Sequence, residues 1–178
     1  MAVAAFGIGP GTDAREGGEA EAEAEALLAR HAGSPWYEAA RPVMDSWTER
    51  LLAATDAAEM EQMMATVLPF YLAEPDKPEV AARLADMSAA MKANLAAGQA
   101  WEGGLYQSVD LRPLLGRITC PTLIVAGELD FICGPAQARP IAAGITGSQL
   151  VMLPGCGHIP SIEKPEEYRH AVVEFLRG

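Results

Sequence analysis

Two residues in the last third of the chain have side chains suited to acid–base catalysis. Asp130 follows the apolar run Thr122–Ala126, and His158 follows the apolar run Gln149–Leu153. A carboxylate beside an imidazole fixes the tautomer of the ring and stabilises the imidazolium that forms when histidine takes a proton from a nucleophile. Either residue alone has an ordinary role, as a turn residue or a surface group. As a pair, they are predicted to be the acid and the base of a hydrolytic triad.

The elements around this pair predict an open parallel sheet. Both apolar runs have the composition of strands that are buried on two faces. A helix is expected between them at Pro135–Ile145, and another is expected to begin at Pro165. In a sheet with this β-α-β-α order, the loops that follow the strands open at one edge. Asp130 and His158 should therefore lie at the same edge.

The preceding sequence is predicted to be mostly helical. Ala2–Ile8 is interpreted as a short buried strand, Ser34 as the N-cap of a helix that begins at Pro35, and Glu74–Pro78 as a turn. An amphipathic helix should follow, with its apolar stripe at Val80, Leu84, Met87, Met91 and Leu95. The methionines of the helical sequence could line an adaptable apolar pocket or simply pack in the core; they are Met60, Met63, Met64, Met87 and Met91. The predicted organisation is a strand end and loop at 1–16, a helical region at 17–110, and a sheet region at 111–178.

The composition favours a small-molecule or peptide substrate over a polyanion. The net charge is −11 over 178 residues, which disfavours binding to nucleic acid or an anionic membrane, because both require clustered Lys and Arg. Three cysteines without CxxC spacing indicate neither a disulfide framework nor a zinc site. The apolar N-terminus lacks the basic start of a signal peptide. We therefore expect a cytoplasmic protein without a metal or cofactor.

The sheet region resembles the closing segments of α/β-hydrolase fold enzymes. Ile118–Asp130, Leu153–Pro160 and Glu163–Glu167 carry the resemblance, together with the final helix. The resemblance implies that the chain forms the C-terminal part of the hydrolase's parallel sheet, with an inserted helical cap at 17–110. The sequence looks nearest to proline iminopeptidase-like hydrolases, with esterases and lactonases as relatives. The resemblance also implies Asp130 as the triad acid and His158 as the general base. The candidate pocket residues that it implies are Phe131, Ile132 and Ile159.

The nucleophile of that family is absent from the sequence. The family places it on a G-x-S-x-G elbow, ahead of the acid and the histidine. No serine and no cysteine of this chain has glycine two positions away on both sides. Only three strands can be identified, which is few for a parallel sheet that needs neighbours on both sides. The expectation is a hydrolase of amide or ester bonds whose nucleophile is supplied by a missing N-terminal portion or a complementary chain.

Other functions remain open at this point. Cys133 and Cys156 each flank one of the two candidates, so a cysteine nucleophile within the chain is conceivable, although small buried residues are the simpler interpretation. An aspartate nucleophile, as in epoxide hydrolases and dehalogenases, would also have to come from upstream sequence. The alternative of another class is a non-catalytic binding or regulatory protein that retains half of the fold. Such a protein would hold an apolar ligand or a partner chain against its methionines, Phe70, Tyr71 and Trp101.

Overall fold

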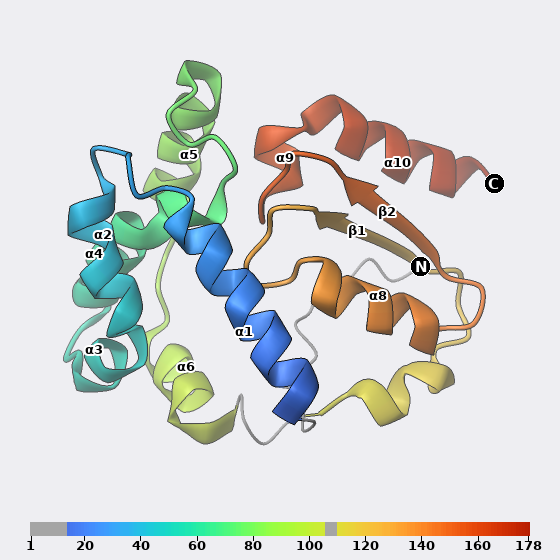
Figure 1. Cartoon of the computed structure of the whole chain (residues 1–178), viewed down its shortest axis with the longest axis horizontal. Helices are drawn as coiled ribbons and strands as arrows, with labels where there is room; N and C mark the ends of the chain where they lie inside the picture. Colours follow the sequence, from blue (N-terminus) through green and yellow to red (C-terminus); the bar gives the residue numbers. More distant parts are fainter. Residues whose placement is uncertain (1–13, 106–109) are drawn as a thin grey trace.

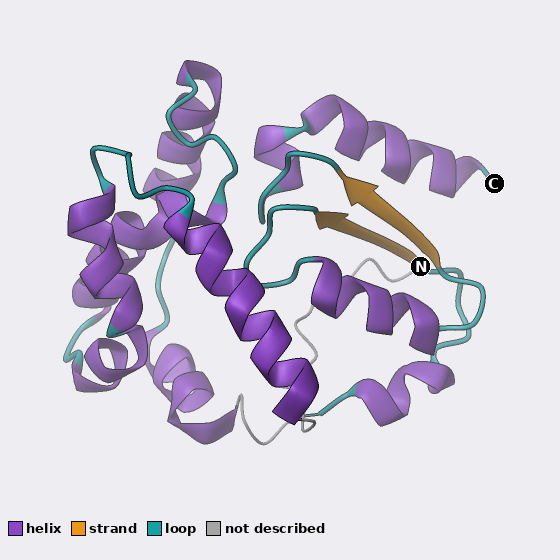
Figure 2. Cartoon of the chain, viewed as in Figure 1, coloured by secondary structure: helices purple, strands orange, loops and turns teal. Residues whose placement is uncertain are grey.

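The computed structural model describes residues 14–105 and 110–178 (Figure 1). Within the first of these ranges the chain forms helices and loops, and the second contains a pair of strands flanked by helices (Figure 2). The expected strand Ala2–Ile8 lies outside the described residues. The helices of the first range are α1 (Ala14–Ala29), α2 (Tyr37–Asp45), α3 (Trp47–Ala53), α4 (Ala57–Val67), η1 (Leu68–Tyr71), α5 (Pro78–Ala90), α6 (Leu95–Ala100) and η2 (Trp101–Leu105).

The helical part has its own apolar core. Phe70 of η1 is 3% exposed and packs with Leu28, Ala40 and Val67 from three different helices. Three rings meet Phe70 edge-on at centroid distances of 5.0 to 6.1 Å; they are those of His31, Trp36 and Tyr37. This core fixes η1, and with it the chain that follows η1 toward the sheet.

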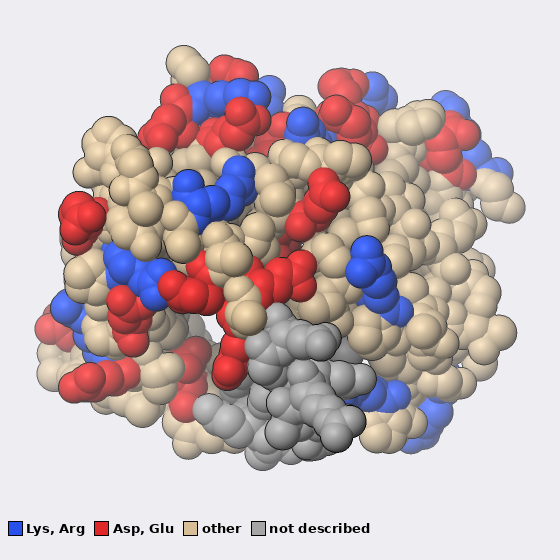
Figure 3. All heavy atoms as spheres, viewed as in Figure 1, with Lys and Arg blue, Asp and Glu red and all other residues tan. Residues whose placement is uncertain are grey.

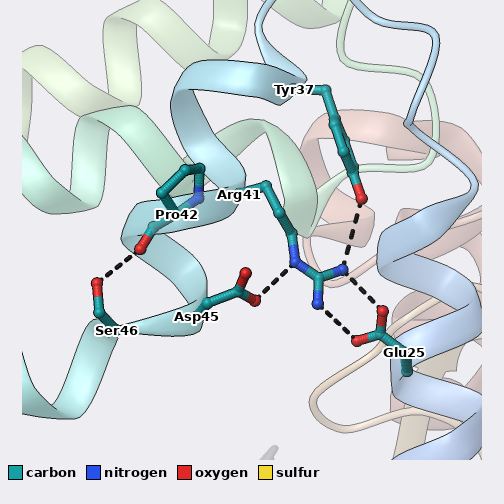
Figure 4. A network of polar contacts seen from close by, with 6 residues as sticks. All are labelled: Glu25, Tyr37, Arg41, Pro42, Asp45 and Ser46. Carbon is teal, nitrogen blue, oxygen red and sulfur yellow. Dashed lines mark hydrogen bonds and ion pairs between the residues drawn. The ribbon is translucent and has the colours of Figure 1, made fainter.

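A charged network on the surface ties α1 to α2. Arg41 donates through both terminal nitrogens to Glu25, at 2.9 and 2.8 Å, and through Nε to Asp45 at 2.6 Å (Figure 4). The hydrogen bond to Arg41 holds the pKa of the Glu25 carboxyl below its ordinary value. Because Glu25 is exposed, this contact contributes little to stability, and it serves mainly to orient the two helices.

The expected start of the second helix is wrong by two residues. α2 begins at Tyr37 with Trp36 at its N-cap, and Ser34 makes no capping bond. Instead Ser34 lies in a turn, donating its N–H to the carbonyl of His31 at 2.8 Å. The indole of Trp36 packs against His31 and donates to Asp76 at 3.2 Å. These long-range contacts outweigh the local capping preference.

The amphipathic helix expected to reach Leu95 is interrupted. α5 ends at Ala90, Met91 has an extended backbone, and α6 starts after Asn94, whose side chain accepts the Ala97 N–H at 3.0 Å. The first half of the stripe behaves as expected. Its members pack against Leu72, Ile159 and Ile162; they are Val80, Leu84 and Met87. The helical part therefore contacts the segment that follows the last strand.

The strands are parallel and adjacent. β1 (Leu123–Gly127) pairs with β2 (Gln149–Leu153), with Leu123 opposite Gln149 and Gly127 opposite Leu153. Figure 1 shows the sheet between α8 and α10, one on each face. Ile124 and Ala126 pack on α8, and alternation along the strand directs the other residues of β1 to the opposite face. The remaining elements of this part are η3 (Arg112–Arg117), α8 (Pro135–Gly144), α9 (Pro160–Glu163) and α10 (Pro165–Arg177).

The sequence-based boundaries of this part agree closely with the structure. β2 and the start of α10 are as expected, α8 ends one residue early, and β1 is shifted by one residue. No helix within the described residues is long and apolar enough to cross a bilayer. On the face shown in Figure 3, Lys and Arg are scattered among Asp and Glu and form no basic patch.

Candidate active site

The loops that leave β1 and β2 lie against each other at one edge of the sheet. Glu128 donates its N–H to the carbonyl of Leu153 at 3.0 Å, and Leu129 donates to Cys156 at 2.8 Å. A Cβ atom at Gly127 would lie 2.1 Å from the carbonyl oxygen of Gly157. Only glycine at position 127 allows the two loops to approach this closely.

Asp130 is held rigidly at this edge. Its side chain is 4% exposed. One carboxylate oxygen, Oδ1, accepts the backbone N–H groups of Ile132 at 2.8 Å and Cys133 at 3.0 Å. The other, Oδ2, lies 2.9 Å from Nδ1 of His158. Both oxygens thus have partners, and the carboxylate cannot rotate away without losing them.

His158 is oriented by its backbone as well as by Asp130. Its N–H donates to the carbonyl of Tyr71 at 2.7 Å, and its side chain is 30% exposed. Because Asp130 occupies Nδ1, the ring nitrogen left to exchange a proton is Nε2. The arrangement is therefore a carboxylate-oriented imidazole that can act as a general base.

Tyr71 is a site residue that the catalytic assignment from sequence did not include. Its ring meets the rings of His158 and Phe131 edge-on, each at 5.4 Å. Burial, assisted by the charge of Asp130, raises the pKa of the Tyr71 phenol to about 12. The phenol therefore stays protonated near neutral pH. No local motif predicts this position, because Tyr71 belongs to η1, which is far from His158 in the chain.

A cavity of about 200 Å³ opens beside the pair and is lined by Asp130, His158 and Ile159. All five residues of β1 also line it. Since successive strand residues point to opposite faces, such a cavity lies along the backbone edge of β1. Of the three expected pocket residues, Ile159 lines this cavity, whereas Phe131 and Ile132 do not. Phe131 meets the ring of Tyr71 edge-on, and Ile132 contributes its backbone N–H to Asp130.

The cysteines near the pair have unreactive environments. Burial raises the pKa of the Cys156 thiol to about 12 and that of Cys133 to about 11. Cys156 is 0% exposed. Since the thiolate is the nucleophilic form, neither group is activated near neutral pH.

Replacing Cys133 or Cys156 with alanine should therefore leave kcat within about threefold of the parent. Steady-state kinetics on the active protein measure this, with Cys120→Ala as the control. A loss of several orders of magnitude at either position would make that cysteine the nucleophile.

Within residues 14–105 and 110–178, no three His, Cys, Asp or Glu side chains come together as a metal-binding group.

Comparison with known proteins places the chain in a family. A family described as alpha/beta hydrolase fold matches residues 30–165. A pimeloyl-[acyl-carrier protein] methyl ester esterase of Stenotrophomonas maltophilia is 27% identical over 147 residues, which are 82% of this chain and 55% of the esterase. A proline iminopeptidase of Lactobacillus crispatus is 37% identical over 76 residues, covering 43% of this chain and 24% of that enzyme.

Solved structures agree. The enol-lactonase from Burkholderia xenovorans superposes with a TM-score of 0.60 at 26% identity, covering 75% of this chain and 51% of the lactonase. The chain thus spans about half the length of the esterase and of the lactonase. Since the family match extends over more than half of its residues, the chain belongs to the alpha/beta hydrolase fold family.

Proposed function

We propose that this chain supplies the acid and the base of a hydrolase that cleaves an amide or ester bond through a Ser-His-Asp triad. The observation that carries the proposal is the 2.9 Å contact between Oδ2 of the buried Asp130 and Nδ1 of His158. Relatives named as a methyl ester esterase and a proline iminopeptidase support an ester or amide bond as the target.

In the proposed reaction, a serine hydroxyl attacks the carbonyl carbon of the substrate. Nε2 of His158 takes the hydroxyl proton and then gives it to the leaving alcohol or amine, which leaves an acyl-enzyme. Water attacks this ester with His158 again acting as base, and the serine recovers its proton. Asp130 accepts the hydrogen bond from Nδ1–H and stabilises the imidazolium.

The serine and the oxyanion hole are assigned to a complementary N-terminal segment or chain. No G-x-S-x-G elbow occurs in the sequence, and the chain spans about half of its longer relatives. The cavity along β1 supports this assignment, because it follows the edge at which a further strand would pair. Residues 17–110 are proposed to form the cap that selects the substrate. We place the enzyme in the cytoplasm, acting on a small-molecule or peptide substrate.

Intact-mass analysis and size-exclusion chromatography of the natural, active protein test this assignment. We expect catalytic activity to elute with a species heavier than the 18.8 kDa chain, either as one longer polypeptide or as two associated chains. A stable and active monomer of 18.8 kDa would contradict it.

A further inference from the structure

The loop that carries His158 is attached to the helical part through the carboxylate of Glu163 and through a backbone hydrogen bond. Glu163, the last residue of α9, accepts the N–H of Gly157 on Oε1 at 2.9 Å and the N–H of Ala73 on Oε2 at 2.6 Å. Gly157 directly precedes His158, and Ala73 lies two residues after Tyr71. The carboxylate therefore bridges the histidine loop and the segment that leaves η1.

A direct backbone bond lies beside this bridge. His158 donates its N–H to the carbonyl of Tyr71 at 2.7 Å. A Cβ atom at Gly157 would lie 2.5 Å from that same carbonyl oxygen and 2.9 Å from Oε1 of Glu163. The two segments are thus as close as glycine permits, and His158 directly follows this point of contact.

The chemistry of the bridge requires a carboxylate. Each oxygen of Glu163 accepts from a different N–H, and a glutamine could offer an acceptor to only one of them while turning an N–H₂ donor toward the other. Burial raises the pKa of the Glu163 carboxyl, against the opposing effect of the backbone N–H groups of Ala73, Gly157 and Ile159. Unlike Glu166, which is exposed and pairs with Arg169, Glu163 is directed into the protein.

We infer that Glu163 is a positioning residue: it holds Gly157 against the Ala73 segment so that the imidazole of His158 stays aligned with Asp130. The catalytic meaning of this role rests on the proposed function, because it requires His158 to be the general base. The alignment itself exists whether or not the chain turns over a substrate, so it is measurable separately.

The test compares Glu163→Gln with Glu167→Gln, which removes the same charge from an exposed position in the first turn of α10. The first measurement is the low-field proton resonance of the Nδ1–H of His158, which reports its hydrogen bond to Asp130. The second is kcat and KM of the complete enzyme. In Glu163→Gln we expect the resonance to broaden or disappear, and kcat to fall about 100-fold with KM within about twofold of the parent. Glu167→Gln should leave the resonance and kcat unchanged.

Glu163→Asp provides a second variant that keeps the charge. Its shorter side chain can reach one N–H donor but not both, so kcat should fall at least about tenfold and the resonance should weaken. If Glu163→Gln does not fold, the same criteria apply to Glu163→Asp. Folded variants with an intact resonance and parental kcat would overturn the inference. Loss of folding in both would also overturn it, because a residue that only aligns His158 is not needed for the whole fold.

These readouts separate the two proposals. A parental protein that shows the resonance but has no hydrolase activity would remove the proposed function, and the resonance of the variants would still decide the role of Glu163. Conversely, activity that depends on His158 but not on Glu163 would remove this inference alone.

Discussion

Replacing His158 with alanine is expected to lower kcat of the complete enzyme at least about a thousandfold. Under the proposed function, the substitution removes the group that takes the proton of the attacking hydroxyl. It also leaves Oδ2 of the buried Asp130 without its partner, so circular dichroism and a melting curve must accompany the kinetics.

His170→Ala is the matched control for this prediction. His170 is exposed on α10, and its removal should leave kcat unchanged. Turnover of His158→Ala within about tenfold of the parent, in a folded protein, would remove His158 from the mechanism.

Replacing Asp130 with asparagine is expected to lower kcat about 10⁴-fold, the loss seen when the same substitution is made in a serine protease triad. The asparagine Oδ1 can still accept the N–H groups of Ile132 and Cys133, which preserves the turn. Its amide nitrogen, however, would donate toward Nδ1 of His158. The proton of the neutral ring would then move to Nε2, and that nitrogen could no longer act as the base.

Asp86→Asn serves as the control for this prediction, because Asp86 is exposed on α5. A melting curve will separate a wrong tautomer from a loss of fold, since the folded Asp130→Asn protein should keep the parental melting temperature within a few degrees. Kinetics over a range of pH then measure the loss of kcat in the folded variant. A folded Asp130→Asn enzyme with parental kcat would show that Asp130 only shapes the turn.

The strands and helices of the sheet region could be predicted from the sequence because their signals are local. Leu150–Leu153 is a continuous apolar run after a turn, and Pro165 with two following glutamates is a strong helix start. Once these elements were placed, the geometry of parallel sheets required Asp130 and His158 to share an edge. The 2.9 Å separation of their side chains agrees with that expectation, while their catalytic roles stay predictions.

The supporting residues could not be located in this way, because their contacts join segments distant in the chain. Tyr71 contacts His158 at a sequence separation of 87, and Ala73 contacts Glu163 at a separation of 90. The predicted start of α2 was wrong for a similar reason, since Trp36 packs on His31 and on the distant Phe70. Asn94, in contrast, is a capping residue whose local signal could have predicted the break before α6.

The most direct test of the account is to label the natural, active protein with a fluorophosphonate and to identify the modified residue by peptide mass spectrometry. The reagent reacts with a serine only where a base activates it. We expect one labelled serine outside these 178 residues, in a polypeptide that is continuous with this chain or co-purifies with it, and we expect His158→Ala to abolish the labelling. A labelled residue within this chain, or an active protein that resists the reagent, would contradict it.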